Sequence, residues 1–270
     1  MGCKTLNTEG FPGAAPPGAR EVLQKLISSQ FVPIFGTWHG RVLPKGPGSK
    51  KLVAMCYAAL QTQAMKGQLG PYQFHVQVRT QTDLLERVVY PLQVMLFGRR
   101  ATKTGEKELV DGQFGLVPDW VDDERGGPKY GRHCYNARSE SVFDKPSFRK
   151  AIMQRRAVIP VAAFLEVADV GPTSGKHFSV AREDKAPIFL AGLWEHNARY
   201  NLESCSIITS EPIDLVKDSH SRSPVLLAPQ DLDRWLDPSL SGEEISQEFL
   251  KVGSSAGLVI QDSPNRKPKG

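Results

Sequence analysis

Four short apolar runs in the second half of the chain constrain its fold more than any other feature of the sequence. Each run contains residues that favour β-strands, such as Val, Ile or Phe. The runs cover residues 156–161, 164–167, 187–193 and 205–209. Helical patterns lie at 146–155, 229–237 and 242–251, the last of which follows the capping-box pair Ser241 and Glu244. The sequence therefore predicts an α+β fold with mostly antiparallel strand pairing.

The two ends of the chain differ in composition from its middle. Residues 1–19 are rich in Gly, Pro and Ala, and residues 20–31 favour a short amphipathic helix. We expect residues 1–54 to be an N-terminal extension that is disordered, cleaved or the product of an over-long gene model. Residues 55–252 are expected to form the folded domain, and residues 253–270, which end in PNRKPKG, a disordered basic tail.

The overall composition excludes several classes of protein. Apolar residues make up 40% and charged residues 23% of the chain, which excludes a collagen, a coiled coil and a wholly disordered protein. No apolar run reaches the ~20 residues of a membrane span, and the N-terminus lacks an apolar signal core. We therefore expect a cytoplasmic protein without a membrane partner. The formal net charge of +5 permits a nucleic-acid partner without requiring one.

The four cysteines are widely scattered along the chain. They are Cys3, Cys56, Cys134 and Cys205. Because they form no C-x-x-C pair, the sequence does not support a zinc site, and we expect no metal. An intracellular chain of this size does not need disulfides, so the cysteines are interpreted as free thiols.

Four segments carry residues with distinctive chemistry. They are Met55-Cys56-Tyr57-Ala58, NARSE from Asn136 to Glu140, VIPVAAFLE from Val158 to Glu166, and Thr209 followed by DSHSRSPV. Taken separately, each has an ordinary structural explanation. Cys56 suits a small buried position, Glu166 the solvent side of a strand, and His220 a core or surface position. Arg138 and Arg222 suit the surface.

Taken together, the segments resemble the SRAP family, the abasic-site processing proteins once called SOS-response-associated peptidases. The resemblance covers roughly residues 55–237. It includes an initiator Met-Cys, then FGLVPDW, NARSE, the IPVAAFLE strand pair, a Thr and HSRSPVLL, in that order. NARSE and H-x-R-x-P are specific when they occur in this order. The resemblance implies a barrel-like core of twisted, mostly antiparallel sheets with short flanking helices.

The resemblance also implies a DNA-repair activity in the DNA-damage response. Proteins of this kind bind single-stranded DNA, or a junction with double-stranded DNA, at an abasic site. Their N-terminal Cys, which corresponds to Cys56 here, joins the sugar aldehyde in a thiazolidine DNA–protein crosslink that shields the lesion. We expect a DNA-associated monomer that needs neither a metal nor an organic cofactor.

An N-terminal Cys suits this chemistry because it presents an α-amine and a thiol on adjacent carbons. The amine has a reference pKa of ~7.7–8, so part of it is neutral near pH 7 and can form a Schiff base with the aldehyde. The thiol then closes a five-membered ring in an intramolecular step. An internal cysteine has no free α-amine, so this activity requires Cys56 at the mature N-terminus.

Three further residues are candidates for the proton transfers of this reaction. Glu166 is the candidate general acid/base near the amine, and His220 is the candidate acid for opening the sugar ring. Asn136 carries both a donor and an acceptor and could orient the amine and the sugar hydroxyl. With Cys56, they form the predicted catalytic set.

Four residues are candidates for DNA binding. The planar guanidinium groups of Arg138 and Arg222 suit charge-assisted contacts with phosphates. By the resemblance, Thr209 matches a phosphate contact of the family. Trp120 matches an aromatic residue that packs against DNA, where stacking needs no particular base.

The sequence departs from the family pattern in three places. Cys56 is internal in this chain, so translation must begin at Met55, or cleavage must occur before Cys56, to expose its amine. The residue two positions after the cysteine is usually Arg and is Ala58 here. Gly and aromatic residues usually surround the glutamate, and their places are taken by Ala163, Leu165 and Val167.

Two other functions remain open. A chain that retains its leader would be a non-covalent binder of single-stranded DNA. A chain that removes its leader through Cys56 would be a thiol autopeptidase, and thus a hydrolase. The Schiff base of the leading hypothesis also makes weak strand-cleaving lyase activity an expected side reaction.

Overall fold

The computed structural model describes residues 57–62, 67–76 and 87–262, all within one structural unit that spans Leu52–Gly270. The N-terminal extension with its expected helix at 20–31 lies outside the described residues, and so does Cys56. In the described part of the chain, no helix combines the length and the apolar character needed to cross a membrane.

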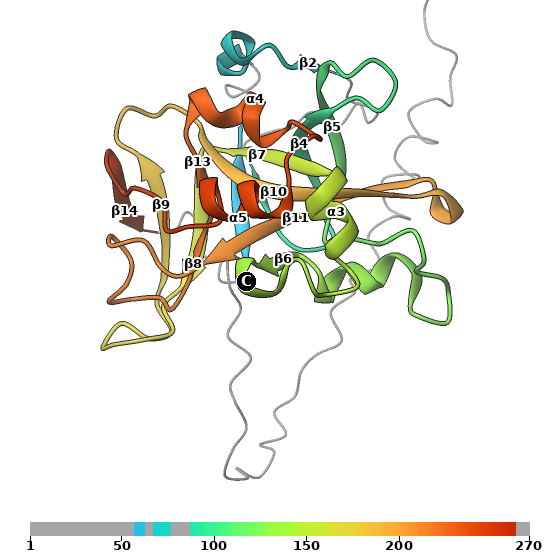
Figure 1. The fold of residues 1–270 in the computed structure, drawn as a ribbon. Coiled ribbons are helices and arrows are strands. Elements are labelled where there is room, and N and C mark those ends of the chain that lie inside the picture. The colour runs from blue at the N-terminus through green and yellow to red at the C-terminus, as the bar shows by residue number, and fades with distance from the viewer. Residues whose placement is uncertain (1–56, 63–66, 77–86, 263–270) are drawn as a thin grey trace, which may run out of the picture. The chain divides into compact units, whose positions relative to one another are not determined.

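Five strands pair in a closed ring, which forms a small barrel (Figure 1). They are β4 (Val94–Arg100), β5 (Lys107–Phe114), β7 (Arg156–Val161), β10 (Ile188–Asn197) and β11 (Leu202–Ser210). Neighbours pair antiparallel in the order β11–β10–β7–β4–β5. A short parallel pairing of Ser204 with Gln113 joins β11 back to β5. The predicted α+β class with mostly antiparallel sheets and a barrel-like core is confirmed.

A second, fully antiparallel sheet continues directly from the barrel. Its strands, in spatial order, are β14 (Leu258–Asp262), β9 (His177–Arg182), β8 (Ala163–Val167), β1 (Ala58–Gln61) and β3 (Arg87–Val89). Only Ala162 separates β7 from β8, so the chain passes from the barrel into this sheet within one residue. In the register of β1 with β8, Ala58 lies opposite Leu165, the residue before Glu166.

Strand β14 corrects the prediction of a disordered tail from residue 253. Leu258–Asp262 pairs with β9 over five positions, and Leu258 packs against the buried cluster of the barrel. The run Leu-Val-Ile at its start has high β propensity, which the surrounding Gly, Ser, Pro and Lys residues obscured. Residues 263–270 lie outside the described residues.

Short elements complete the fold. The remaining strands are β2 (His75–Val76), β6 (Asn136–Arg138), β12 (Ser223–Pro224) and β13 (Leu226–Leu227). The 3-10 helices are η1 (Gly70–Tyr72), η2 (Gly127–His133), η3 (Ser139–Ser141), η4 (Ala198–Tyr200) and η5 (Pro229–Asp231). The α-helices are α3 (Arg149–Gln154), α4 (Leu232–Trp235) and α5 (Gly242–Glu248). They confirm the three helices expected after residue 145, and the capping box of Ser241 and Glu244 is present.

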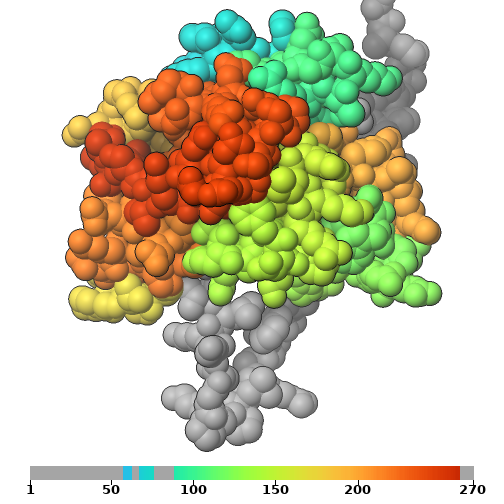
Figure 2. Space-filling view, viewed as in Figure 1, coloured from blue at the N-terminus to red at the C-terminus, as the bar shows by residue number. Residues whose placement is uncertain are grey.

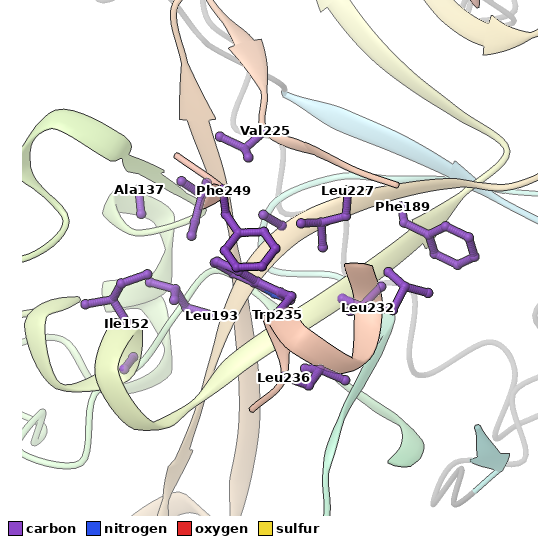
Figure 3. Close-up of a cluster of buried hydrophobic side chains, with 14 of the residues drawn as sticks. Ala137, Ile152, Phe189, Leu193, Val225, Leu227, Leu232, Trp235, Leu236 and Phe249 are labelled. Carbon is purple, nitrogen blue, oxygen red and sulfur yellow. The ribbon is translucent and has the colours of Figure 1, made fainter. Parts of the chain in front are cut away.

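Alternate residues of the barrel strands enter two different buried clusters. Ala157, Ile159 and Val161 of β7 belong to one cluster, whereas Val158 between them belongs to the other. In this second cluster, Trp235 of α4 packs among side chains from α3, α4 and β10 (Figure 3), and its indole nitrogen donates to the carbonyl oxygen of Ala157 at 2.8 Å. Figure 2 shows the C-terminal helices, in red and orange, forming a continuous surface with the segment around α3.

The side chain of Gln61 fills a gap in the barrel. Extending the β4–β7 register from its Gly98–Val158 pair places Leu96 opposite Pro160, which has no N–H to donate. The Gln61 amide nitrogen donates to the carbonyl oxygens of Leu96 and Pro160, and its oxygen accepts from the Leu96 N–H, each at 2.9 Å. The buried amide therefore takes the place of the backbone hydrogen bond that Pro160 cannot donate, and it fixes β1 against the barrel.

We expect Gln61→Met to destabilise the protein strongly, because it leaves three buried backbone groups without their partner. The expected loss in unfolding free energy is about 3 kcal/mol, since each buried unsatisfied group costs roughly 1–3 kcal/mol. Urea denaturation followed by circular dichroism measures this loss. Gln68→Met makes the same change at an exposed position and should leave the midpoint nearly unchanged. Equal midpoints for the two variants would contradict this role of Gln61.

Candidate functional site

A buried carboxylate faces a buried imidazole at the end of β8. Oε2 of Glu166 lies 3.4 Å from Nε2 of His220, and the two side chains are 1% and 0% exposed. Glu166 therefore does not lie on the solvent side of its strand, since all of Ala163 to Glu166 is buried. Two of the predicted catalytic residues are thus in contact, in surroundings that strengthen electrostatic interactions.

The loop before β12 orients the His220 ring. The backbone N–H groups of Ser219 and His220 both donate to the carbonyl oxygen of Val216, at 2.8 Å each, which forms a tight turn. Nδ1 of His220 lies 2.9 Å from the carbonyl oxygen and 3.1 Å from the backbone nitrogen of Arg222. Because one neighbour accepts and the other donates, the backbone can satisfy Nδ1 with or without a proton.

Asp169 ties this loop to the end of β8. Its carboxylate accepts from the Ser221 backbone N–H at 2.8 Å and from the Ser221 hydroxyl, and one of its oxygens lies 4.0 Å from Nδ1 of His220. The Asp169 N–H donates to the carbonyl oxygen of Ser219 at 2.9 Å. These contacts hold His220 opposite Glu166. The sequence offered no signal for Asp169, because its partners lie about 50 residues further along the chain.

Strand β11 brings the NARSE and HSRSP segments together. In its parallel pairing with β6, Asn136 lies opposite Ile207 and Arg138 opposite Thr209. Pro224 of β12 is the antiparallel partner of Thr209. The Thr209 side chain is fully buried, and its hydroxyl accepts from Nε of Arg222 at 3.3 Å. Thr209 supports Arg222 in this structure, and its phosphate contact stays a prediction.

Arg222 makes a bidentate ion pair with Glu140, the last residue of NARSE. The two N···O distances are 2.6 and 2.8 Å, and the side chains are 13% and 51% exposed. The hydrogen bonds from Arg222 hold the pKa of Glu140 below its ordinary value, although partial burial acts in the opposite direction. Arg138 is exposed and makes no ion pair with any described residue. Sequence reasoning assigned no role to Glu140, although the motif itself contains it.

Asn136 and Arg138 border a cavity of about 460 Å³. The rest of its lining includes three aromatic side chains and two basic ones, which are Trp120, Tyr130, Phe148, His133 and Lys145. Trp120 is 38% exposed, and its ring meets the edge of Tyr130 with centroids 5.5 Å apart. Trp120, Asn136 and Arg138 therefore line one cavity, and their predicted roles in binding DNA and the sugar stay predictions.

Two local features place Trp120 beside this cavity. The buried Asn197 side chain donates to the carbonyl oxygens of Pro118 and Val121, at 2.8 and 3.0 Å, and so holds the loop that carries Trp120. Gly115 has φ +127°, and a Cβ there would lie 2.4 Å from the carbonyl oxygen of Gly131. Only glycine allows the FGLVPDW turn to approach η2 this closely.

The structure thus brings together Glu166 with His220, and Asn136 with Arg138 and Trp120. Within the described ranges, no group of three His, Cys, Asp or Glu side chains could hold a metal ion. Cys56 lies outside those ranges, and the nearest described strand residue is Ala58, opposite Leu165.

The fold therefore combines a small barrel, a buried carboxylate–imidazole pair and a cavity with a basic, aromatic lining. The chain belongs to the SOS response associated peptidase (SRAP) family, whose model matches residues 55–261. The family resemblance noted in the sequence is therefore confirmed.

Curated relatives carry a consistent name. The abasic site processing protein YoaM of Bacillus subtilis is 33% identical over 51% of this chain and 60% of its own length. YoqW of the same organism, also named an abasic site processing protein, is 32% identical over 52% of this chain and 62% of its own length. The chain thus spans about 60% of the length of these two relatives.

A solved structure supports the fold. The crystal structure of a protein from Bacteroides thetaiotaomicron superposes with a TM-score of 0.64 at 23% identity. The alignment covers 76% of this chain and 90% of that chain. The similarity therefore extends over most of both proteins and concerns the fold alone.

We expect Glu140→Gln to lower the unfolding free energy near pH 7 by at most about 1 kcal/mol, because the ion pair is half exposed and screened by solvent. Folding lowers the pKa of the Glu140 carboxylate, so its ionised form stabilises the folded protein at pH values above the ordinary pKa of 4.5. This stabilisation is lost as the pH falls through the lowered pKa of the folded state. The difference from the parent protein should therefore shrink as the pH falls below 4.5. Urea midpoints measured at pH 7 and over a series of acidic pH values test this, with Glu211→Gln, at an exposed position, as the control.

Proposed function

We propose that this protein processes abasic sites in single-stranded DNA by forming a covalent thiazolidine crosslink through Cys56 as its mature N-terminal residue. The buried Glu166–His220 pair is the observation that carries the proposal, because it offers an acid and a base in direct contact. The names of the curated relatives support abasic-site processing as the general role.

The register of β1 supports Cys56 as the nucleophile. Ala58 lies opposite Leu165, so β1 begins beside the residue that precedes Glu166. Two peptide units join Cys56 to Ala58, each about 3.8 Å between Cα atoms, which makes a short tether. Gln61 fixes the other end of β1 to the barrel. An amine and a thiol at residue 56 would then be confined near the acid–base pair, which favours the intramolecular second step.

In the proposed mechanism, each proton has a donor and an acceptor. As the abasic sugar opens to the aldehyde, His220 gives a proton to the ring oxygen. The proton that leaves the anomeric hydroxyl is taken by Glu166 and returns to His220, with which Glu166 is in contact. The α-amine of Cys56 attacks the aldehyde carbon, and Glu166 takes a proton from nitrogen and returns it to the hydroxyl that leaves as water. The thiol adds to the resulting imine carbon, and its proton passes to nitrogen. The net reaction joins amine, thiol and aldehyde and releases one water.

The surface around Asn136 supports DNA as the ligand. Arg138 is exposed and unpaired with any described carboxylate, which suits a backbone phosphate. Trp120 lines the same cavity and offers a ring on which a base can stack. Arg222 would have to exchange its bonds to Glu140 for a phosphate, so we expect it to contribute less to affinity than Arg138.

The crosslink is tested with a chain that starts at Met55 and an abasic single-stranded oligonucleotide. We expect an adduct that survives a denaturing gel and has the mass of protein plus DNA minus one water. Cys56→Ala should abolish the adduct and leave non-covalent binding nearly intact. An adduct that persists in Cys56→Ala would exclude this chemistry.

The same measurements separate the other hypotheses. A native protein with its full-length mass and no adduct would indicate a non-covalent binder. If the Cys56→Ala variant of the full chain keeps a leader that the parent removes, Cys56 is an autopeptidase nucleophile. Strand cleavage at the lesion by the parent protein would reveal the lyase side reaction.

Phosphate contacts are tested by the salt dependence of binding. Each lost contact should lower the slope of log K against log salt by about 0.7 on a single strand. We expect Arg138→Ala to show this change in full and Arg222→Ala to show less. Lys251→Ala, which removes an exposed cation outside this site, is the control. An unchanged slope for Arg138→Ala would contradict its assignment.

A further inference from the structure

Three rings from different segments of the chain meet at the start of β1. The Tyr57 hydroxyl lies 2.9 Å from Nδ1 of His177, and the two rings meet edge to face at 80° with their centroids 5.7 Å apart. The Tyr90 ring is a second neighbour, with its centroid 6.0 Å from that of Tyr57. Aromatic rings at such distances attract each other beyond the effect of burial alone. These three residues, called the Tyr57 cluster below, therefore hold the Tyr57 side chain in place.

The Tyr57 cluster lies at the end of the second sheet that carries Glu166. Extending the register of β1 with β8 by one residue places Tyr57 opposite Glu166. His177 begins β9, and its partner in β8 is Val167, the residue after Glu166. Tyr90 directly follows β3, which pairs with β1 on its other edge. The cluster therefore joins three strands beside the proposed acid–base pair.

A strand that begins close to a chain terminus benefits from such an anchor. Terminal residues fray unless packing or hydrogen bonds hold them, and under the proposed function Cys56 is the first residue of the mature chain. One peptide unit of about 3.8 Å between Cα atoms joins Cys56 to Tyr57. A fixed Tyr57 therefore limits how far the amine and the thiol of Cys56 can move.

We propose that Tyr57, Tyr90 and His177 are positioning residues for the crosslinking reaction, which anchor the start of β1 and so keep the amine of Cys56 near Glu166. The inference rests on the proposed function for the identity of the reaction. Positioning of this kind raises the reaction rate of the bound complex, because the amine spends more of its time within reach of the aldehyde. It leaves the affinity for DNA unchanged.

The rate of crosslinking as a function of DNA concentration tests this role. The assay uses the chain that starts at Met55 and abasic single-stranded DNA in excess. We expect Tyr57→Ala to lower the maximal rate about tenfold and to leave the half-saturating DNA concentration unchanged, because the lost positioning acts on the bound complex. Tyr57→Phe keeps the ring and loses only the hydroxyl, so it should retain most of the rate.

A second variant changes the cluster without altering β1. His177→Ala removes an exposed side chain, and with it the polar partner and one neighbouring ring of Tyr57. We expect the maximal rate to fall severalfold, again at an unchanged half-saturating concentration. His75→Ala makes the same substitution at an exposed position of β2, outside the cluster, and should react like the parent protein. Circular dichroism verifies that each variant folds.

Hydrogen exchange of the full chain, followed by mass spectrometry, tests the anchor without any reaction. We expect the amides of β1 to exchange severalfold faster in Tyr57→Ala than in the parent protein, because the start of the strand frays. Equal exchange in the two proteins would overturn the inference, and so would a maximal crosslinking rate that Tyr57→Ala leaves unchanged.

A loss confined to the half-saturating concentration would also overturn the inference, because the cluster would then be a DNA contact. A parent protein that forms no adduct contradicts the proposed function instead. Hydrogen exchange then still shows whether the cluster anchors β1, so the two failures are distinguishable.

Discussion

The contact between β5 and β11 closes the barrel, and the candidate site depends on it. A Cβ at Gly112 would lie 2.6 Å from the carbonyl oxygen of Glu203, so the two strands can approach this closely only with glycine in that place. Beyond this contact, β6 pairs with the same edge of β11, and β12 pairs with the other edge once the β10–β11 pairing has ended at Ile207. One strand therefore carries both NARSE and HSRSP, and their relative position follows from how the barrel closes.

Charge pairing then divides the basic residues of the site into two kinds. Arg222 is neutralised by Glu140 and bound to Thr209, so it mainly joins two segments. Arg138 and Lys145 make no ion pair with a described carboxylate, and both line a cavity without acidic groups. Burial keeps Glu166 and His220 apart from this surface charge. The site thus contains a buried carboxylate–imidazole pair and, separately, a basic cavity bordered by the exposed side chains of Arg138 and Trp120.

Local sequence patterns predicted the elements that are defined by interactions between residues close together in the sequence. The strand at 156–161 has its predicted bounds, and the capping box starts α5 as expected. Strands β4 and β5 are not among the strands expected from the sequence, and each contains a glycine, a residue that disfavours strands. At Gly98 a Cβ would lie 2.3 Å from the ring of Phe74, so packing between distant segments dictates this glycine. Such contacts cannot be read from neighbouring residues.

The same distinction applies to the site. The family resemblance pointed to Glu166 and His220, but the pattern of β8 suggested a solvent-facing glutamate, because alternation cannot reveal that both faces of a strand are covered. Gln61 is a similar case, since its role exists only because Pro160 lacks an N–H at the point where β4 meets β7. The available signal was a polar residue at the end of the otherwise apolar strand AALQ. Strand β1, which begins two residues after the proposed nucleophile, is thus held in place by Gln61 at the point where Pro160 interrupts the hydrogen bonding between β4 and β7.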